Sequence, residues 1–227
     1  MHIADSACFV EDIGKGALTM GKKRVGIFGG TFDPIHMGHL RMAEHVFQSM
    51  DLEKIIFIPA YVPPHKLGQD FAPAQARYAM TELAVADNPH FIVSDMELKR
   101  SGVSYTIDTI RQLHKLYADK ELHFIIGADS VAQLHTWHNI EEMLELTRFV
   151  AVWRPGYEDA MDELVRHLGE GAKQRVLLLD TPVYDISSTE IRTRIRQGAS
   201  LAGFVPKGVE NYIYEDGLYG CKVGDKK

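Results

Sequence analysis

The sequence is poor in several features, and each scarcity excludes a class of protein. Its only cysteines, Cys8 and Cys221, form no C-x-x-C pair, so they cannot build a zinc or dithiol site. No apolar run approaches the ~20 residues that a helix needs to cross a bilayer. Basic residues are not in excess, because 25 Lys and Arg face 31 Asp and Glu, a formal net charge of −6. This balance argues against a protein that wraps nucleic acid, but a small phosphorylated ligand needs only a local cluster of donors.

The chain shows no Pro/Ser-rich linker and no internal repeat, and its 45% hydrophobic content excludes a disordered chain. Residues 1–22 carry acidic side chains and lack an apolar core, so they do not resemble a signal peptide. We expect residues 1–22 to be a flexible or loosely docked extension, and Met20 stays open as an alternative start. Residues 23–227 are expected to form one domain with a small helical C-terminal part at about residues 187–219. The simplest interpretation is that both cysteines are free thiols in a reducing cytoplasm, and a disulfide between the two ends of the chain is the alternative.

Short apolar runs alternate with segments of helical period from Arg24 onward. The runs cover residues 24–28, 54–59, 90–93, 122–127, 148–153 and 175–180. Because they are continuous rather than alternating, they predict strands buried on both faces. Three helical faces are predicted from apolar residues at helical spacing: Leu40, Ala43, Phe47 and Met50; Ala76, Ala79, Met80 and Leu83; and Ile107, Ile110, Leu113 and Tyr117. The start of a fourth helix is predicted from Asn139 and Glu142, which have capping-box spacing. The pattern predicts an α/β fold, a Rossmann-like, doubly wound, mainly parallel sheet with helices on both faces.

Unusual polar and glycine-rich stretches follow five of the predicted strands. They read GGTFDPIHMGH, AYVPPHK, GADS, RPG and DISSTEIRTRIR, in chain order. Ligands of open parallel sheets bind beyond the carboxyl ends of the strands, where the strand order reverses. These stretches are therefore expected to meet at one edge of the sheet and to form the functional site.

The first stretch has the character of a phosphate-binding turn. Gly29 and Gly30 let the backbone turn sharply and approach a ligand, although a glycine pair alone is usually only a turn. Neither the dinucleotide fingerprint nor the Walker A loop is present. His36 and His39 flank Gly38 at the start of a helix expected near His39, where unpaired N–H groups attract anions. A solvated histidine pair and a metal pair are the alternatives, but no third ligand with metal spacing accompanies them.

The second stretch indicates another helix start that faces an anion. Ser187 and Glu190 have capping-box spacing, so Ser188, Thr189 and the first backbone amides point beyond the sixth strand. Arg192 lies in the first turn, where a cation opposes the helix dipole and therefore indicates an anionic partner. Arg194 and Arg196 are interpreted as a solvated basic face.

Taken together, G-G-T-F-D-P-x-H-x-G-H and I-S-S-T-x-I-R resemble the nucleotidylyltransferase superfamily, and within it the bacterial nicotinate mononucleotide adenylyltransferases. The resemblance runs from about Arg24 to Tyr219 and includes P-P-H-K at 63–66, S-Y-T at 104–106, I-G-A-D at 126–129 and the tail at 204–213. It implies an enzyme that transfers AMP from ATP to nicotinate mononucleotide, giving deamido-NAD and pyrophosphate in NAD biosynthesis. It also implies Mg²⁺ carried by the ATP phosphates, with no metal site on the protein.

The resemblance implies roles for individual residues and partners. The catalytic residues would be His36, His39 and Arg192. The ATP-binding residues would be these three together with Gly29, Gly30, Thr31, Phe32, Gly127, Asp129, Ser187 and Ser188. The mononucleotide-binding residues would be Thr31, Lys66, Thr106, Trp137 and Arg154. Trp137 would stack on the nicotinate ring. The partners would be ATP and nicotinate mononucleotide, with no nucleic acid and no membrane, in the cytoplasm; a homo-oligomer stays open.

Simpler interpretations stand beside these roles. Trp137 could be a half-buried packing residue, Lys66 a surface lysine, Asp129 a helix cap, and Asp33 the residue that shapes a turn before proline. Phosphopantetheine adenylyltransferases share both motifs, but they are shorter and give no reason for Trp137 or P-P-H-K. Class I aminoacyl-tRNA synthetases share an H-x-G-H motif, but need a K-M-S-K-S loop that is missing here. A non-catalytic nucleotide-binding module would not need both motifs.

Overall fold

The computed structural model describes residues 22–64, 68, 70–153, 159–182 and 185–221. Its centre is a six-stranded sheet in the order β3-β2-β1-β4-β5-β6, in which every neighbouring pair is parallel. The strands are β1 (Arg24–Gly30), β2 (Leu52–Pro59), β3 (Phe91–Val93), β4 (Glu121–Gly127), β5 (Arg148–Val152) and β6 (Val176–Leu179). The predicted parallel sheet is confirmed, and each strand lies within two residues of the run that predicted it.

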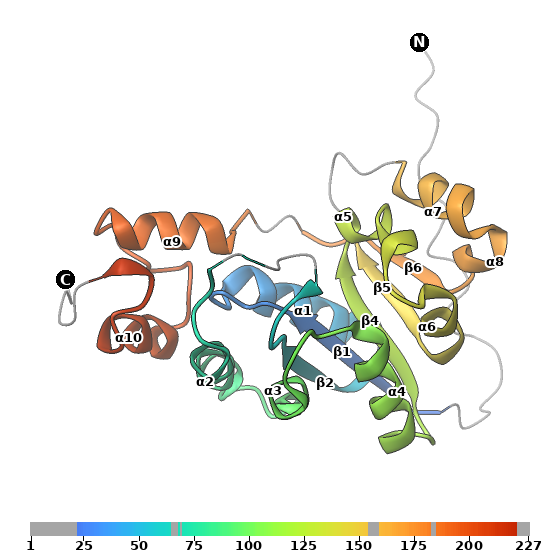
Figure 1. Cartoon of the computed structure of the whole chain (residues 1–227), viewed down its shortest axis with the longest axis horizontal. Coiled ribbons are helices and arrows are strands. Elements are labelled where there is room, and N and C mark those ends of the chain that lie inside the picture. The colour runs from blue at the N-terminus through green and yellow to red at the C-terminus, as the bar shows by residue number, and fades with distance from the viewer. Residues whose placement is uncertain (1–21, 65–67, 69, 154–158, 183–184, 222–227) are drawn as a thin grey trace, which may run out of the picture.

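Helices connect the strands and extend beyond the last one. They are α1 (Met37–Ser49), α2 (Ala74–Val85), α3 (Met96–Arg100), α4 (Thr106–Leu116), α5 (Ala128–Val131), α6 (Ile140–Leu146), α7 (Ala160–Leu168), α8 (Glu170–Lys173), α9 (Ser188–Arg196) and α10 (Lys207–Glu215), with short 3₁₀ turns η2 (Leu134–Thr136) and η3 (Leu218–Gly220). Figure 1 shows α9 and α10 gathered at one end of the sheet and α7 and α8 at the other. Within the part of the chain described, no helix is both long and apolar enough to cross a membrane.

Two apolar clusters lie on opposite faces of the sheet. On one face, Val25 and Ile27 of β1 belong to the cluster that holds the buried side of α4 and α6. On the other face, Phe28 of β1 belongs to the cluster that holds α1, Met80 of α2 and the buried residues of α9 and α10. Each cluster removes a large apolar area from water, which is the main force that holds a sheet between helices. The predicted doubly wound arrangement, with helices on both faces, is therefore confirmed.

Two local predictions are wrong in detail. Asn139 adopts a left-handed conformation (φ 55°) and, within the described chain, its side chain makes no capping hydrogen bond to α6. Glu142 instead accepts a hydrogen bond from Arg111 Nε of α4 at 2.7 Å, so a contact between helices has replaced the expected capping box.

In α2, Leu83 is 43% exposed and lies beside Gly208 of α10, whereas Arg77 is only 1% exposed. The buried face of α2 is therefore centred on an arginine that apolar periodicity does not detect.

The C-terminal segment closes back on α10. The thiol of Cys221 lies 3.3 Å from the carbonyl oxygen of Ile213 and 3.0 Å from that of Leu218, and is placed to donate to them. Cys8 lies outside the described residues, so the question of a terminal disulfide is untested.

Candidate active site

The order of the sheet reverses between β1 and β4, and in such sheets the ligand crevice lies beyond the carboxyl ends of these strands. β1 ends at Gly30 and β4 at Gly127. A polar cavity of about 190 Å³ lies beyond β1. Its lining consists of Thr31, Phe32, Asp33, His39, Asp70, Phe71, Ser188, Thr189 and Arg192. The cavity thus gathers residues from both motifs singled out in the sequence.

The two histidines cap the N-terminus of α1. The helix begins at Met37, two residues earlier than predicted, because His36 is its N-cap. His36 Nδ1 accepts from the backbone N–H of His39 at 3.4 Å, and His39 Nδ1 accepts from the backbone N–H of His36 at 3.3 Å. The two rings are stacked with their centroids 3.6 Å apart. This is a capping box in which two imidazoles replace the usual hydroxyl and carboxylate.

These hydrogen bonds define which ring nitrogens carry protons. A backbone N–H can only donate, so both Nδ1 atoms must be acceptors and therefore carry no proton. In the neutral rings, the proton then sits on Nε2 of His36 and of His39. In this tautomer each histidine carries an Nε2–H group beside the first turn of α1, whose own amides also favour an anion, and His39 is the one of the two that lines the cavity.

Packing explains the glycines and the aromatic residue of the first motif. A Cβ on Gly38 would lie 3.0 Å from His36 Nδ1, so a larger residue would push the imidazole a few tenths of an ångström from its capping position. A Cβ on Gly30 would come within 2.9 Å of the Phe32 ring. Phe32 is 2% exposed, has a left-handed backbone (φ 48°), and meets His39 edge-on at 5.1 Å between centroids. Its side chain therefore packs against His39 from the core.

The start of α9 is bonded directly to the loop after β1. Ser187 is the N-cap, and its Oγ accepts from the backbone N–H of Glu190 at 3.1 Å, as the spacing predicted. Ser188 Oγ donates to the carbonyl oxygen of Pro34 at 2.9 Å, although these residues are 154 positions apart. Arg192 Nη1 donates to the carbonyl oxygen of Asp33 at 2.7 Å. The two motifs therefore meet in space and share one cavity.

Asp33 does more than shape the turn before proline. It is 5% exposed, and its Oδ1 accepts from the backbone N–H of Ala72 at 3.1 Å and from the Tyr219 hydroxyl at 2.8 Å. Burial, followed by the neighbouring Asp33 carboxylate, raises the pKa of Tyr219 far above its ordinary value, so the phenol stays a donor. The sequence interpretation missed this contact, because nothing local links Asp33 to a residue 186 positions later.

Arg77 is a second residue that the sequence interpretation missed. Its Nε donates to Ala72 O at 2.9 Å, its Nη1 to Thr31 O at 2.7 Å and to Ala60 O at 2.6 Å, and its Nη2 to Tyr61 O at 3.0 Å. Burial lowers the pKa of this guanidinium, but an arginine remains charged at neutral pH. One side chain therefore ties together the segments that follow β1 and β2 and the segment that precedes α2.

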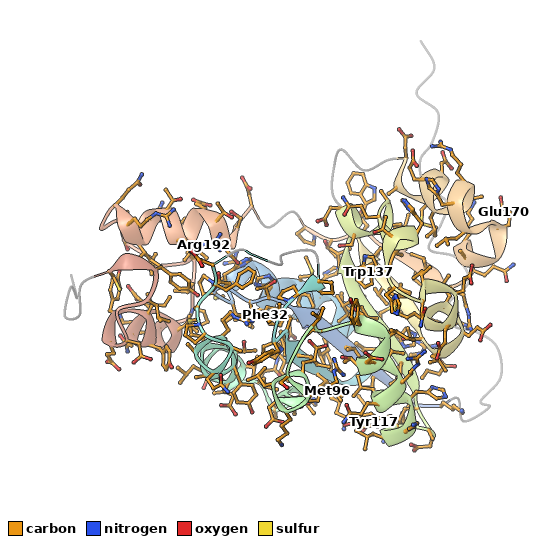
Figure 2. All side chains as sticks on the ribbon, in the orientation of Figure 1. Phe32, Met96, Tyr117, Trp137, Glu170 and Arg192 are labelled. Atoms are coloured by element: carbon orange, nitrogen blue, oxygen red, sulfur yellow. The ribbon has the colours of Figure 1, made fainter. Side chains whose placement is uncertain are left out.

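The residues implied for the ribose and the mononucleotide lie on the β4 side. Among the residues that the structure describes, the lining of the cavity does not include Gly127, Asp129, Thr106 or Trp137. Asp129 lies in the first turn of α5 without capping it, and Thr106 begins α4. Trp137 packs edge-on against Phe124 and Phe149, each at 6.2 Å between centroids. In the view of Figure 2, Phe32 lies between Arg192 and Trp137. Lys66 and Arg154 lie outside the described residues.

Comparison with known proteins defines the class. The family model described as "Cytidylyltransferase-like" matches residues 27–194, a range that includes most of β1, the other five strands and both motifs. The chain therefore belongs to the cytidylyltransferase-like family of nucleotidyltransferases, and within it to the nicotinate-nucleotide adenylyltransferases, as the relatives below indicate.

Two relatives carry the name "Probable nicotinate-nucleotide adenylyltransferase". One, from Desulfitobacterium hafniense, is 45% identical over 199 residues, which are 87% of this chain and 96% of the relative. The other, from Geobacillus thermodenitrificans, is 45% identical over 204 residues, 90% of this chain and 88% of the relative. A solved structure of Plasmodium falciparum nicotinic acid mononucleotide adenylyltransferase complexed with NaAD superposes with a TM-score of 0.72. That match covers 88% of this chain and 99% of the other at 17% identity, so it supports the fold alone.

Proposed function

We propose that the cavity and the neighbouring end of β4 carry out the reaction of this family: AMP passes from ATP to nicotinate mononucleotide, and deamido-NAD and pyrophosphate are released. This proposal is carried by the observation that α9 is hydrogen-bonded to the loop after β1 and that both line one polar cavity. A module that only senses a nucleotide would not need donors from both ends of the chain on one polyanion.

The triphosphate of ATP would occupy the cavity. The Nε2–H groups of His36 and His39, the amides at the start of α1, and Arg192 together supply donors and positive potential for it. The ribose would lie at the end of β4. The ATP site of this proposal consists of Gly29, Gly30, Thr31, Phe32, His36, His39, Gly127, Asp129, Ser187, Ser188 and Arg192, of which His36, His39 and Arg192 are the catalytic residues.

Nicotinate mononucleotide would bind beyond β4, next to the ATP. Its pocket would consist of Thr31, Lys66, Thr106, Trp137 and Arg154. The edge-on contacts of Trp137 with Phe124 and Phe149 hold its indole in one orientation. A rigid indole face suits a flat, electron-poor ring such as nicotinate.

The chemistry requires positioning rather than an enzyme nucleophile. A phosphate oxygen of the mononucleotide attacks the α-phosphorus of ATP in line, and the bond from that phosphorus to the β-phosphate oxygen breaks, which releases pyrophosphate. The attacking phosphate is already largely ionised at neutral pH, since its second pKa is about 6, so no general base is needed. Donors that neutralise the developing charge on the pyrophosphate would supply most of the rate enhancement.

Mg²⁺ enters the proposal as part of the substrate, MgATP. Among the described residues, no group of three or more His, Cys, Asp or Glu side chains could hold a metal ion. The ion would be held by phosphate oxygens and water, which is how Mg²⁺ often binds in phosphoryl-transfer sites, and it would neutralise part of the triphosphate charge.

Two further parts of the proposal concern the whole chain. Residues 23–227 would act as one nucleotidylyltransferase domain, since both β1 and the C-terminal Tyr219 contribute to the surroundings of one cavity. The enzyme would work in the cytoplasm, where ATP is available and where thiols such as Cys221 stay reduced.

A comparison of acceptors tests the proposed function. Pyrophosphate release is measured with ATP and, in turn, nicotinate mononucleotide, nicotinamide mononucleotide and phosphopantetheine. We expect the highest kcat/KM with nicotinate mononucleotide, and deamido-NAD as the product by mass spectrometry. Faster transfer to phosphopantetheine would reassign the acceptor, and no release of pyrophosphate with any acceptor would contradict the enzymatic function.

Substitution of Trp137 tests the acceptor side. In W137A, we expect the KM for nicotinate mononucleotide to rise at least about tenfold, since loss of an aromatic stacking partner costs about 1–3 kcal/mol. The KM for ATP should change less than about twofold, because Trp137 does not share the cavity proposed for the triphosphate. W137F is the control, since it keeps an aromatic ring against Phe124 and Phe149 and should be affected less. Equal increases in both KM values would argue against stacking.

A further inference from the structure

Two carboxylates, Asp33 and Asp70, line the cavity, and the proposed reaction does not explain the buried one, Asp33. Asp33 lines a space proposed for a polyanion, where a negative charge weakens binding by Coulomb repulsion. Its Oδ2 lies 3.7 Å from Arg192 Nη1, but the shorter contact of Arg192, at 2.7 Å, is with the carbonyl oxygen of Asp33. A carboxylate in this place needs a function that outweighs its repulsion.

The partners of Asp33 indicate that function. Its Oδ1 is held by the Tyr219 hydroxyl and by the backbone N–H of Ala72, which come from separate parts of the chain. Because these two donors bind the carboxylate, the side chain of Asp33 stays in one rotamer. This in turn holds the backbone of Asp33, whose carbonyl oxygen accepts from Arg192. Hydrogen bonds to a charged acceptor are stronger than neutral ones, so this arrangement is well defined.

Tyr219 itself has an unusual backbone conformation. Its φ of 60° and ψ of 20° fall in the left-handed region, which a bulky side chain rarely adopts. Such a conformation persists only where the surrounding structure imposes it, and it is often associated with a functional site. Here the hydroxyl contact with Asp33 and the packing of η3 against α9 hold the residue in place.

We propose that Tyr219 and Asp33 form a positioning pair, in which the Tyr219 hydroxyl fixes Asp33 and thereby holds the loop after β1 and Arg192 in the arrangement that binds the triphosphate. Neither residue takes part in bond making. The pair lies on the β1 side of the site, so it acts mainly on ATP; of the residues proposed for the mononucleotide, Thr31 alone belongs to the loop after β1. The identity of the anion as ATP rests on the proposed function.

The variant Y219F tests the pair, with Y212F as a matched control. Tyr212 of α10 also interacts through its hydroxyl with an aspartate, Asp216, but this aspartate, unlike Asp33, is not among the described residues that line the cavity. Binding of MgATP is measured by calorimetry, and the KM values of both substrates by pyrophosphate release. We expect Y219F to bind MgATP about tenfold more weakly, which corresponds to loss of about one charged hydrogen bond. Its KM for nicotinate mononucleotide should stay within about twofold, and Y212F should bind MgATP like the wild type.

Removal of the carboxylate separates positioning from simple repulsion. If Asp33 were only a like charge in the cavity, D33A would bind MgATP more tightly; the positioning pair requires weaker binding. D33N, which keeps an acceptor for Tyr219, should lie between D33A and the wild type, and it serves if D33A fails to fold. In the double variant Y219F/D33A, we expect the loss of affinity to be close to that of D33A alone, since the two residues act as one unit.

Several outcomes would overturn the proposal. They are unchanged MgATP affinity in Y219F, tighter binding in D33A or D33N, losses that multiply in the double variant, or equal increases of both KM values together with a lower melting temperature. Calorimetry also separates this proposal from the proposed reaction. If the wild type binds MgATP but transfers no AMP to any acceptor, the reaction fails, while the comparison of affinities still decides the role of the pair.

Discussion

Replacement of His39 by glutamine is expected to lower kcat by about a hundredfold to a thousandfold, which is the usual cost of removing one preorganised donor to a developing anion. Glutamine is chosen because it is the common capping-box partner at the third helical position. Its side chain can still accept from the backbone N–H of His36, as His39 Nδ1 does at 3.3 Å. The helix start is then kept, and the imidazole Nε2–H, which can carry a positive charge, is replaced by the neutral amide N–H of glutamine.

The corresponding variant of the first histidine is H36N. Asparagine is a preferred N-cap, so it can replace the bond from His36 Nδ1 to the backbone N–H of His39. We expect kcat to fall about as far as in H39Q. H36A should lose activity and in addition about 1 kcal/mol of stability, because the cap is lost as well.

Steady-state kinetics together with urea unfolding distinguish these effects. A fall in kcat without a fall in unfolding free energy identifies the histidines as donors to the substrate. If H36N and H39Q both turn over at near wild-type rates, the two imidazoles serve only to cap α1, and the mechanism proposed here is wrong.

The features that could be predicted from the sequence are local ones. Each strand was visible as a continuous apolar run, since strands of a parallel sheet are buried on both faces. The first motif was visible because glycines and histidines stand close together before a helix, and the second because a serine cap stands close to an arginine in the first helical turn. Ser187 is the example: its cap on Glu190 needs only three residues, and the structure has it at 3.1 Å. The roles of the individual site residues stay predictions.

What the sequence could not show depends on contacts between distant segments. Asp33 looked like a turn residue, because its partner Tyr219 is 186 positions away. The reciprocal cap of His36 and His39 was missed for a different reason: histidine is rarely a cap, so spacing rules written for Ser, Thr and Glu place the helix start too late. The capping box predicted from Asn139 and Glu142 was wrong in the opposite way: the spacing was right, but Arg111 of a neighbouring helix binds the carboxylate instead.

Arg77 shows the same limit most clearly, and its removal is expected to cause the largest loss of stability. Four carbonyl oxygens around the site share this one guanidinium, and the residue is 1% exposed. In R77M, the methionine fills much of the space but donates nothing, so buried carbonyls lose their partners. Each such loss costs about 1–3 kcal/mol, and we expect the unfolding free energy to fall by about 3–5 kcal/mol in total.

Two further variants define the cause. R77K keeps a charge, but a single ammonium cannot reproduce the planar fork that reaches Ala72, Thr31 and Tyr61, so it should rescue only part of the stability. R166M removes an exposed arginine that pairs with Glu163 on the surface of α7, and should change the unfolding free energy by less than about 1 kcal/mol. Urea denaturation measures all three, and an R77M protein as stable as R166M would show that the segments after β1 and β2 hold together without the guanidinium. Because Thr31 lines the cavity and Ala60 follows β2, the same variant should also raise the KM for ATP, which links the stability of these loops to the geometry of the site.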